Sequence, residues 1–212
     1  MIDYSVYLVT DDPSRYKGNW LENVRAAVEG GVTCVQYRDT ESGADERFLR
    51  VRALQDALGG RVPLVINNEP ELAAAVRAEG VHVGQSDLPP DAVRAIVGPR
   101  CEIGLSLTCL DDLARLSCAD AVGIGPVFDA RKTKADASTA IGLAGLSAIL
   151  SALPRRSSPF PNCAIGGITR ANAAEVLRAG AGGLAVVSAF SQSDDPYGTA
   201  RDFALLSDCC RQ

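Results

Sequence analysis

Two segments of the sequence combine cations with polar side chains that bind phosphate groups. Gln36 and Arg38 lie two residues apart in the apolar run Cys34–Arg38, so in a strand both side chains point the same way, and we expect that direction to be inward, into the mouth of a barrel. A buried arginine is costly unless it meets an anion or a carboxylate. The long irregular segment 125–142 carries further cations and hydroxyls, among them Arg131, Lys132, Thr133 and Lys134. Because a loop of this length is commonly functional, we predict that it covers a phosphate, the alternative being a solvated polar loop.

Carboxylate and amide oxygens that could bind a divalent cation follow two other apolar runs. Asn68 and Glu69 follow the run Pro63–Asn67, and Asp87 follows the run Gly80–Val83. Mg²⁺ prefers hard oxygen ligands and commonly takes only one or two carboxylates, with phosphates and waters completing its shell. We therefore predict that these three residues are candidate Mg²⁺ ligands. A helix cap is the alternative role for Asp87, because prolines follow it closely.

Two apolar runs near the end of the sequence are followed by small residues that suit phosphate binding through the backbone. Gly166 and Gly167 follow the run Asn162–Ile165, and Ser188 follows the run Gly183–Val187. Glycines at a strand exit let the backbone approach a ligand, and the N–H groups of the next helix point at an anion. The last two strands of a (β/α)₈ barrel supply such a phosphate site. Each run alone is equally compatible with a buried strand and an ordinary turn.

His82, the single histidine, lies in the middle of an expected strand, where a core role and a catalytic role are equally compatible with the pattern. No Ser/His/Asp or Cys/His combination can be assembled, which argues against hydrolysis by an activated nucleophile. The seven cysteines are odd in number and include no CxxC pair. We expect free thiols in a reducing cytoplasm.

Alternating strand and helix patterns must position these residues. The expected strands are Ser5–Thr10, Cys34–Arg38, Pro63–Asn67, Gly80–Val83, Glu102–Ser106, Ala121–Ile124, Asn162–Ile165 and Gly183–Val187. The expected helices are Asn19–Gly30, Asp45–Leu58, Pro70–Ala78, Pro90–Val97, Cys109–Leu116, Leu143–Leu150, Thr169–Ala179 and Pro196–Cys209. Eight strand–helix units predict a single α/β domain over residues 1–212, a (β/α)₈ TIM barrel. An open doubly wound sheet is disfavoured because the turn after the first strand is not glycine-rich.

Composition limits the classes of partner. The chain has 212 residues, 47% of them hydrophobic, and a net charge of −5. Without a basic run, binding to nucleic acid is not expected. No signal peptide and no apolar run of membrane-spanning length is found, so we expect a cytoplasmic protein. Whether it forms a homo-oligomer stays open.

Taken together, these motifs resemble the thiamine-phosphate synthase family over nearly the whole chain, from Tyr7 to about Ala204. The motifs that carry the resemblance are Tyr7–Asp12, Val35–Asp39, Ile66–Asn68, Gly80–Asp87, Gly104–Ser106, Gly123–Phe128, Lys132–Lys134, Ala164–Thr169 and Val186–Ser191. The resemblance implies a barrel that joins 4-amino-2-methyl-5-hydroxymethylpyrimidine diphosphate to 4-methyl-5-(2-phosphooxyethyl)thiazole. Thiamine phosphate and pyrophosphate would be released through a pyrimidine cation, with Mg²⁺ required.

The resemblance also implies roles for single residues. Catalytic roles fall to Arg38, Ser106 and Lys134. Substrate contacts fall to Gln36, Arg38, Asn67, Ser106, Thr133, Lys134, Gly167, Val187 and Ser188. Of these, Gln36 and Arg38 would meet the pyrimidine diphosphate, and Lys134 the pyrophosphate. Gly167 and the turn Val187–Ser188 would hold the thiazole phosphate. Mg²⁺ would be bound by Asp87, with Asn68 and Glu69 as further candidates.

This chain departs from the family pattern at three positions. Thr40 stands where the family usually has a lysine that grips the diphosphate, and Asn68 where it has a metal-binding aspartate. Thr108 stands where a histidine is frequent, and a related thiazole tautomerase depends on that histidine. Segment 125–142 also holds one residue more than usual, which adds a cation. The alternatives to a synthase are a phosphate-binding barrel without catalysis, the tautomerase, and other phosphate-binding barrel enzymes.

Overall fold

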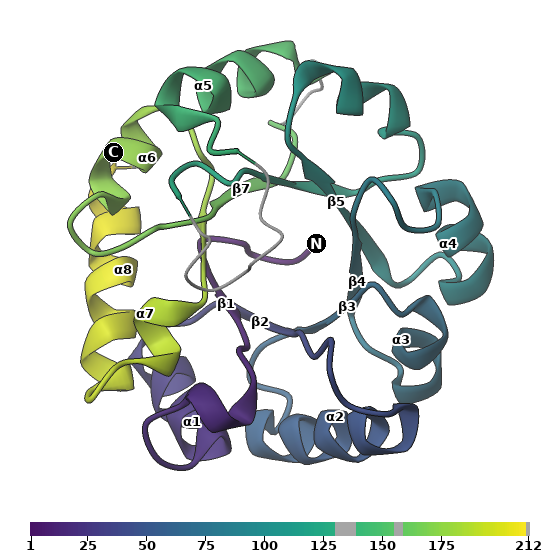
Figure 1. Ribbon diagram of the computed structural model, residues 1–212, viewed down its shortest axis with the longest axis vertical. Coiled ribbons are helices and arrows are strands. Elements are labelled where there is room, and N and C mark those ends of the chain that lie inside the picture. Colours follow the sequence, from purple (N-terminus) through teal and green to yellow (C-terminus); the bar gives the residue numbers. More distant parts are fainter. Residues whose placement is uncertain (130–138, 155–158, 211–212) are drawn as a thin grey trace.

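Eight parallel strands, each paired with its neighbours in sequence order, close into a barrel with helices around it (Figure 1). The computed structural model describes residues 1–129, 139–154 and 159–210. Its strands are β1 (Val6–Val9), β2 (Cys34–Tyr37), β3 (Leu64–Asn67), β4 (Gly80–Val83), β5 (Glu102–Leu107), β6 (Ala121–Ile124), β7 (Asn162–Ile165) and β8 (Leu184–Val186). Pairing of β8 with β1 closes the ring, so the prediction of a (β/α)₈ TIM barrel is confirmed.

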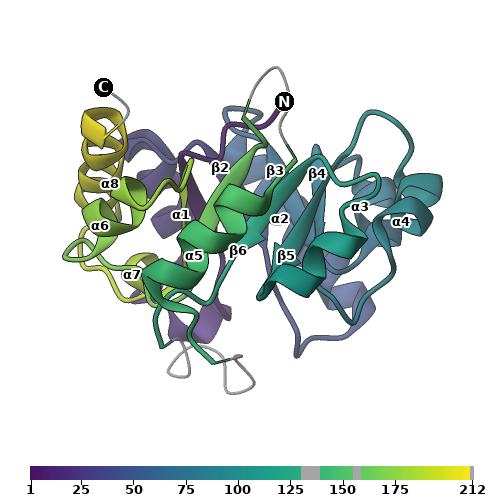
Figure 2. The same cartoon turned by 90° about the horizontal axis from the view of Figure 1, so that it is seen from above.

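The helices lie outside the strands, and the N-terminus and the end of α8 lie at the same end of the barrel (Figure 2). The α-helices are α1 (Trp20–Gly30), α2 (Ala44–Leu58), α3 (Pro70–Val76), α4 (Pro90–Val97), α5 (Gly142–Ala152), α6 (Ala173–Arg178), α7 (Ser188–Ser191) and α8 (Pro196–Cys210). Two 3₁₀ helices are η1 (Pro13–Arg15) and η2 (Leu110–Arg115). Within the described residues, no helix is long and apolar enough to cross a membrane.

Side chains alternate between the helix-facing side of each strand and the barrel interior. The outer side packs against the helices in one large core that includes Leu8, Ile66 and Leu105. The inner side forms a second, smaller cluster that includes Tyr7, Val65 and Cys163. Because both faces are covered, most strand positions are buried, which explains the continuous apolar runs of the sequence.

Local chemistry accounts for the starts of three helices, α1, α3 and α4. The side chain of Asn19 accepts hydrogen bonds from the N–H groups of Leu21 and Glu22, so it caps α1. Pro70 and Pro90 occupy the first positions of α3 and α4, where a missing N–H costs nothing.

Apart from small shifts of element bounds, the structure differs from the prediction at η2, at the start of α6 and at α7. The predicted helix 109–116 is the 3₁₀ helix η2, whose first turn is held by Asp112. Helix α6 begins at Ala173 and not at Thr169, because the Asn172 side chain bonds the Thr169 N–H and the Gly167 carbonyl. The short helix α7 was not predicted, since four residues are too few for a periodic pattern.

Candidate active site

Register and alternation place a set of polar side chains inside the barrel near the ends of β2 to β5. Val9 pairs with Gln36, Asn67 with His82, and Ser106 with Gly123, so these positions face the interior at neighbouring heights. Gln36 is 4% exposed, and its Nε2 donates a hydrogen bond to the Tyr7 hydroxyl at 2.6 Å. The predicted inward direction of Gln36 is therefore confirmed, and Asn67 lies one strand further along the same wall.

Arg38 leaves the end of β2 with its backbone fixed and its side chain unbonded. Its N–H donates to the Thr10 hydroxyl at 2.9 Å. Its guanidinium has no hydrogen bond or ion pair within the part of the chain that the structure describes, and it is half-buried. A half-buried cation with free donors can bind an anionic ligand at the barrel mouth.

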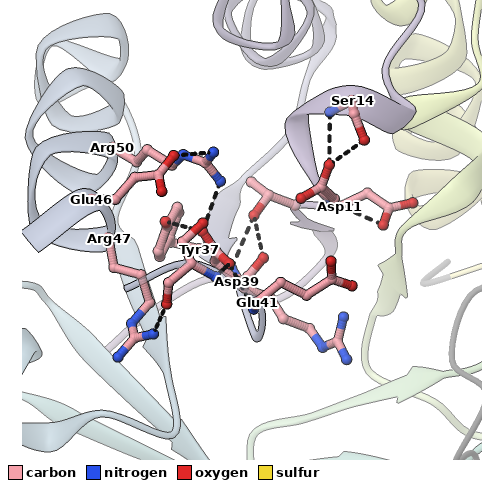
Figure 3. A network of polar contacts seen from close by, with 12 residues as sticks. Asp11, Ser14, Tyr37, Asp39, Glu41, Glu46, Arg47 and Arg50 are labelled. Atoms are coloured by element: carbon pink, nitrogen blue, oxygen red, sulfur yellow. Dashed lines mark hydrogen bonds and ion pairs between the residues drawn. The ribbon is translucent and has the colours of Figure 1, made fainter. Parts of the chain in front are cut away.

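The loop that follows Arg38 is organised by Asp39 (Figure 3). The Asp39 carboxylate accepts hydrogen bonds from the Tyr37 hydroxyl at 2.9 Å, from Arg50 Nη1 at 2.9 Å, and from the N–H groups of Glu41 and Ser42. Burial alone would raise the pKa of Asp39, but these hydrogen bonds hold it well below its usual range. Asp39 is therefore a structural anion of this loop, and the neighbouring Thr40 is exposed.

Asn68 and Glu69, the candidate ligands after β3, are in different environments. Asn68 has a positive φ of 60°, and its N–H donates to the His82 carbonyl at 2.8 Å. Its amide side chain has no bonding partner among the described residues, so its oxygen is available. The Glu69 carboxylate lies 2.8 Å from Nε of Arg47, which also donates to the Ser42 carbonyl. Glu69 would have to share or exchange this ion pair to bind a metal.

His82 lies inside the barrel, where two glycines of the neighbouring strands make room for its ring. A Cβ at Gly104 would overlap Nδ1 of the imidazole, and one at Gly123 would lie 3.0 Å from Cε1. Its Nε2 is 2.9 Å from the Ser106 hydroxyl. Burial lowers the pKa of His82 to about 4, against a smaller opposing effect of Asp87, so the imidazole is neutral at pH 7. His82 therefore fixes Ser106 as an uncharged partner.

The loop after β4 presents Asp87 and is held from two sides. Oδ2 of Asp87 accepts the Gly84 N–H at 2.7 Å, and α4 begins at Pro90 without a side-chain cap, so Asp87 is not that helix's cap. Gln85 Nε2 donates to the Ser106 carbonyl at 2.7 Å. Arg115 of η2 donates to the carbonyls of Gln85 and of Asp87, the latter at 3.0 Å. Sequence reasoning missed Arg115, because a side chain that binds backbone carbonyls leaves no motif.

Thr108 is bound to its own loop. Its N–H and hydroxyl both donate to Oδ2 of Asp112, at 2.6 Å and 2.8 Å. A threonine hydroxyl used in this way cannot replace an imidazole as a proton carrier. This geometry gives no support to the tautomerase alternative.

The ends of β7 and β8 form a rim of small residues, Gly166, Gly167, Val187 and Ser188, called here the β7–β8 rim. Gly166 and Gly167 have φ values of 99° and 64°, and a Cβ on either would overlap the Pro126–Asp129 segment. Val187 and Ser188 lead into α7, whose first N–H groups have no carbonyl one turn earlier to bond. The backbone of this rim is suited to an anion.

The remaining predicted site residues, Lys134, Lys132 and Thr133, lie outside the described residues. Within the described part of the chain, no group of three or more His, Cys, Asp or Glu side chains could hold a metal ion. A cation here would need ligands from a substrate or water as well as from the protein.

Comparisons with known proteins give a consistent result. Residues 6–190 match the family model described as thiamine monophosphate synthase. The thiamine-phosphate synthase of Psychrobacter sp. is 42% identical over 197 residues, covering 91% of this chain and 90% of the relative. That of Azorhizobium caulinodans is 42% identical over 213 residues, covering 99% and 98%. The solved structure of thiamine phosphate pyrophosphorylase from Pyrococcus furiosus superposes with a TM-score of 0.84 at 29% identity, covering 99% of this chain and 98% of that one.

Proposed function

The chain belongs to the thiamine-phosphate synthase family, and we propose on this premise how its residues carry out the reaction. The activity is that of a thiamine-phosphate synthase, a transferase of thiamine biosynthesis. The substrates that family membership implies are a pyrimidine diphosphate and a thiazole phosphate. We assign to this chain the coupling of 4-amino-2-methyl-5-hydroxymethylpyrimidine diphosphate with 4-methyl-5-(2-phosphooxyethyl)thiazole, which yields thiamine phosphate and pyrophosphate.

The unbonded guanidinium of Arg38 is the observation that carries the pyrimidine half of this assignment. Arg38 follows the end of β2, two residues after the inward-facing Gln36, and a diphosphate would supply the anion that its guanidinium lacks among the described residues. Asn67 and Ser106 face the barrel interior from β3 and β5. We assign the pyrimidine to this interior and its diphosphate to Arg38, together with Thr133 and Lys134 of the segment after β6.

The thiazole phosphate is assigned to the β7–β8 rim. Positive φ values at Gly166 and Gly167 bring the backbone close to a ligand, as a larger side chain could not. N–H groups of Gly167, Val187 and Ser188 would then bind the phosphate without a cationic side chain. This is the phosphate position that barrels of this type build after their last two strands.

The donor set at the ends of β3 and β4 fits Mg²⁺. One oxygen of Asp87 and the amide oxygen of Asn68 have no bonded donor among the described residues, and both are hard ligands. We propose that these two residues hold the ion, with Glu69 near them but paired with Arg47. When bound, Mg²⁺ would neutralise negative charge on the diphosphate.

In the proposed mechanism, bond breaking comes before bond making. The C–O bond between the pyrimidine methylene and the diphosphate breaks, and pyrophosphate leaves with the electron pair. The lone pair of the thiazole nitrogen then forms the new C–N bond to the methylene carbon. Arg38 and Lys134 stabilise the leaving charge, and Ser106, fixed by neutral His82, orients the ring. No acid–base pair is needed.

The seven cysteines, all in the described part of the chain, form no disulfide, which supports the cytoplasm as the site of action.

The coupling itself is tested by incubating the purified protein with both heterocycles and Mg²⁺ and separating the products by chromatography. Thiamine phosphate is the expected product. Conversion of the thiazole phosphate alone to an isomer would indicate a tautomerase, and binding without any product would indicate a phosphate-binding barrel.

A further inference from the structure

Thr10 and Asp11 follow β1, the strand that lies between β2 and β8 in the closed barrel. Their side chains are 1% and 4% exposed. A nearly buried aspartate is unusual, because its charge must be met by several hydrogen bonds or ion pairs. The segment after β1 therefore keeps a carboxylate buried although its desolvation costs free energy, and the partners of this carboxylate indicate its role.

Thr10 bonds toward β2. Its hydroxyl accepts the Arg38 N–H at 2.9 Å and lies 3.4 Å from the Arg38 carbonyl. Its own N–H donates to the Gln36 carbonyl at 2.8 Å. These contacts fix the backbone from which the Arg38 guanidinium extends.

Asp11 bonds in the other direction, toward α7. Its Oδ2 accepts the hydroxyl of Ser191 at 3.2 Å, and Ser191 is 0% exposed. Its Oδ1 accepts the Asp12 N–H at 3.0 Å and Arg15 Nη1 at 3.3 Å. Ser191 is the last residue of α7, whose first residue, Ser188, belongs to the β7–β8 rim. The carboxylate thus ties that rim to the exit of β1.

Two hydrogen bonds to backbone carbonyls strengthen the same junction. The Lys17 N–H donates to the Ser191 carbonyl at 3.1 Å, and Gln192 Nε2 donates to the Arg15 carbonyl at 2.5 Å. An ion pair between Lys17 and Asp194 also joins the two segments, but it is exposed and contributes little. Figure 1 shows α7 beside α1.

We propose that Thr10 and Asp11 are positioning residues that set the two half-sites of the coupling reaction relative to each other. This inference rests on the proposed function. Thr10 holds Arg38 for the diphosphate, and Asp11, through Ser191, holds the β7–β8 rim for the thiazole phosphate. The two adjacent side chains act on different substrates, because one bonds to β2 and the other to α7.

The proposal is tested with Thr10→Val, Asp11→Asn and Ser191→Ala, with the KM of each substrate measured separately. Asp11→Asn and Ser191→Ala should raise the KM for the thiazole phosphate about tenfold and leave that for the pyrimidine diphosphate nearly unchanged. Thr10→Val should do the reverse, and Thr10→Ser should restore wild-type values. Lys17→Ala, which removes only the exposed ion pair between the same segments, is the matched control and should match the wild type.

Equal changes in both KM values, or no change in either, would overturn the proposal. For the thiazole phosphate KM, the double variant Asp11→Asn/Ser191→Ala should be no worse than the poorer single variant, since both substitutions act on the contact between Asp11 and Ser191. Additive losses would also contradict the proposal. Calorimetric binding of each substrate to the same variants keeps the test separate from the coupling activity. If the wild type produces no thiamine phosphate, the proposed function fails, whereas the binding pattern still decides the roles of Thr10 and Asp11. Ser191→Ala serves if Asp11→Asn does not fold.

Discussion

Nε2 of His82 lies 2.9 Å from the hydroxyl of Ser106, across the neighbouring strands β4 and β5. The contact exists because Gly104 and Gly123 leave space above β5 and β6 for the imidazole. The same enclosure keeps His82 uncharged at pH 7, since burial lowers its pKa to about 4. A neutral imidazole can form one hydrogen bond with Ser106 without adding a positive charge to the barrel interior.

The low pKa of His82 predicts a loss of stability in mild acid. Between pH 6.5, the value for an ordinary histidine, and pH 4, the unfolded chain binds a proton that the folded protein does not. The contribution is complete above pH 6.5 and falls as the pH is lowered toward 4, by roughly 1 to 3 kcal/mol. Urea unfolding across this range should show it, and His82→Gln should flatten that part of the curve. Parallel curves for the two proteins would contradict the low pKa.

Gly104→Ala should displace His82. The added Cβ would overlap Nδ1, so the ring would have to shift, and a shift would disturb its contact with Ser106. We expect the free energy of unfolding to fall by about 1 to 3 kcal/mol. We also expect coupling activity to fall, because Ser106 loses its partner. Gly43→Ala is the matched control, because a Cβ there meets nothing within 4 Å, and it should cost less than about 1 kcal/mol. Equal effects of the two changes would rule out this account of Gly104.

Arg115→Ala should weaken Mg²⁺ binding without touching a ligand. The side chain donates to the carbonyls of Gln85 and Asp87, so its loss frees the loop that presents the Asp87 carboxylate. The Mg²⁺ concentration for half-maximal activity should rise about three- to tenfold. Arg52→Ala, which removes an exposed arginine of α2 that among the described residues bonds only to Gln55, should leave it unchanged. An unaltered Mg²⁺ dependence for Arg115→Ala would show that the loop holds Asp87 without it.

Asp87→Asn and Glu69→Gln together test the proposed ligand set. Asp87→Asn should raise the Mg²⁺ requirement sharply, about 10- to 100-fold, because a charged ligand is lost. Glu69→Gln should have a smaller effect, since its carboxylate is paired with Arg47. The measurement is activity as a function of Mg²⁺ at saturating substrates, supported by calorimetric titration with Mg²⁺. The reverse order of effects would assign the metal to Glu69.

Arg38→Ala should impair the pyrimidine diphosphate half-site specifically. A bidentate guanidinium contact to a diphosphate oxygen pair contributes about 1.5 to 3 kcal/mol, so the KM for this substrate should rise at least tenfold. The KM for the thiazole phosphate should change little. Arg38→Lys should recover only part of the loss, because lysine lacks the planar fork. Unchanged KM values would remove Arg38 from the site.

The barrel could be predicted from the sequence because each strand is a short run buried on both faces. Strands β4, β6 and β7 have the predicted bounds, and so does α4, where Pro90 marks the first turn. The inward direction of Gln36 followed from alternation within β2 and is confirmed by its bond to Tyr7. The local sequence pattern was therefore enough to predict those features, strand bounds and side-chain direction, that depend on a single strand.

Contacts between distant segments could not be predicted in this way. The pairing of Asp11 with Ser191 joins residues 180 positions apart, and Arg115 reaches Asp87 from 28 positions away. Arg115 acts on backbone carbonyls, which every residue has, so no residue type marks the contact. Helix α7 was missed because four residues carry no period, although the phosphate site was expected there. The ion pair of Glu69 with Arg47 likewise depends on how α2 packs beside β3.

Synthase activity is tested by following pyrophosphate release by the wild-type protein continuously, in reactions that omit one component at a time. We expect sustained release only when the pyrimidine diphosphate, the thiazole phosphate and Mg²⁺ are all present. That result would mean that Thr40 and Asn68 are compatible with synthase activity in this barrel. Absence of release from the complete mixture, with the thiazole phosphate still bound, would contradict the account and leave a barrel that binds one substrate without joining it to the other.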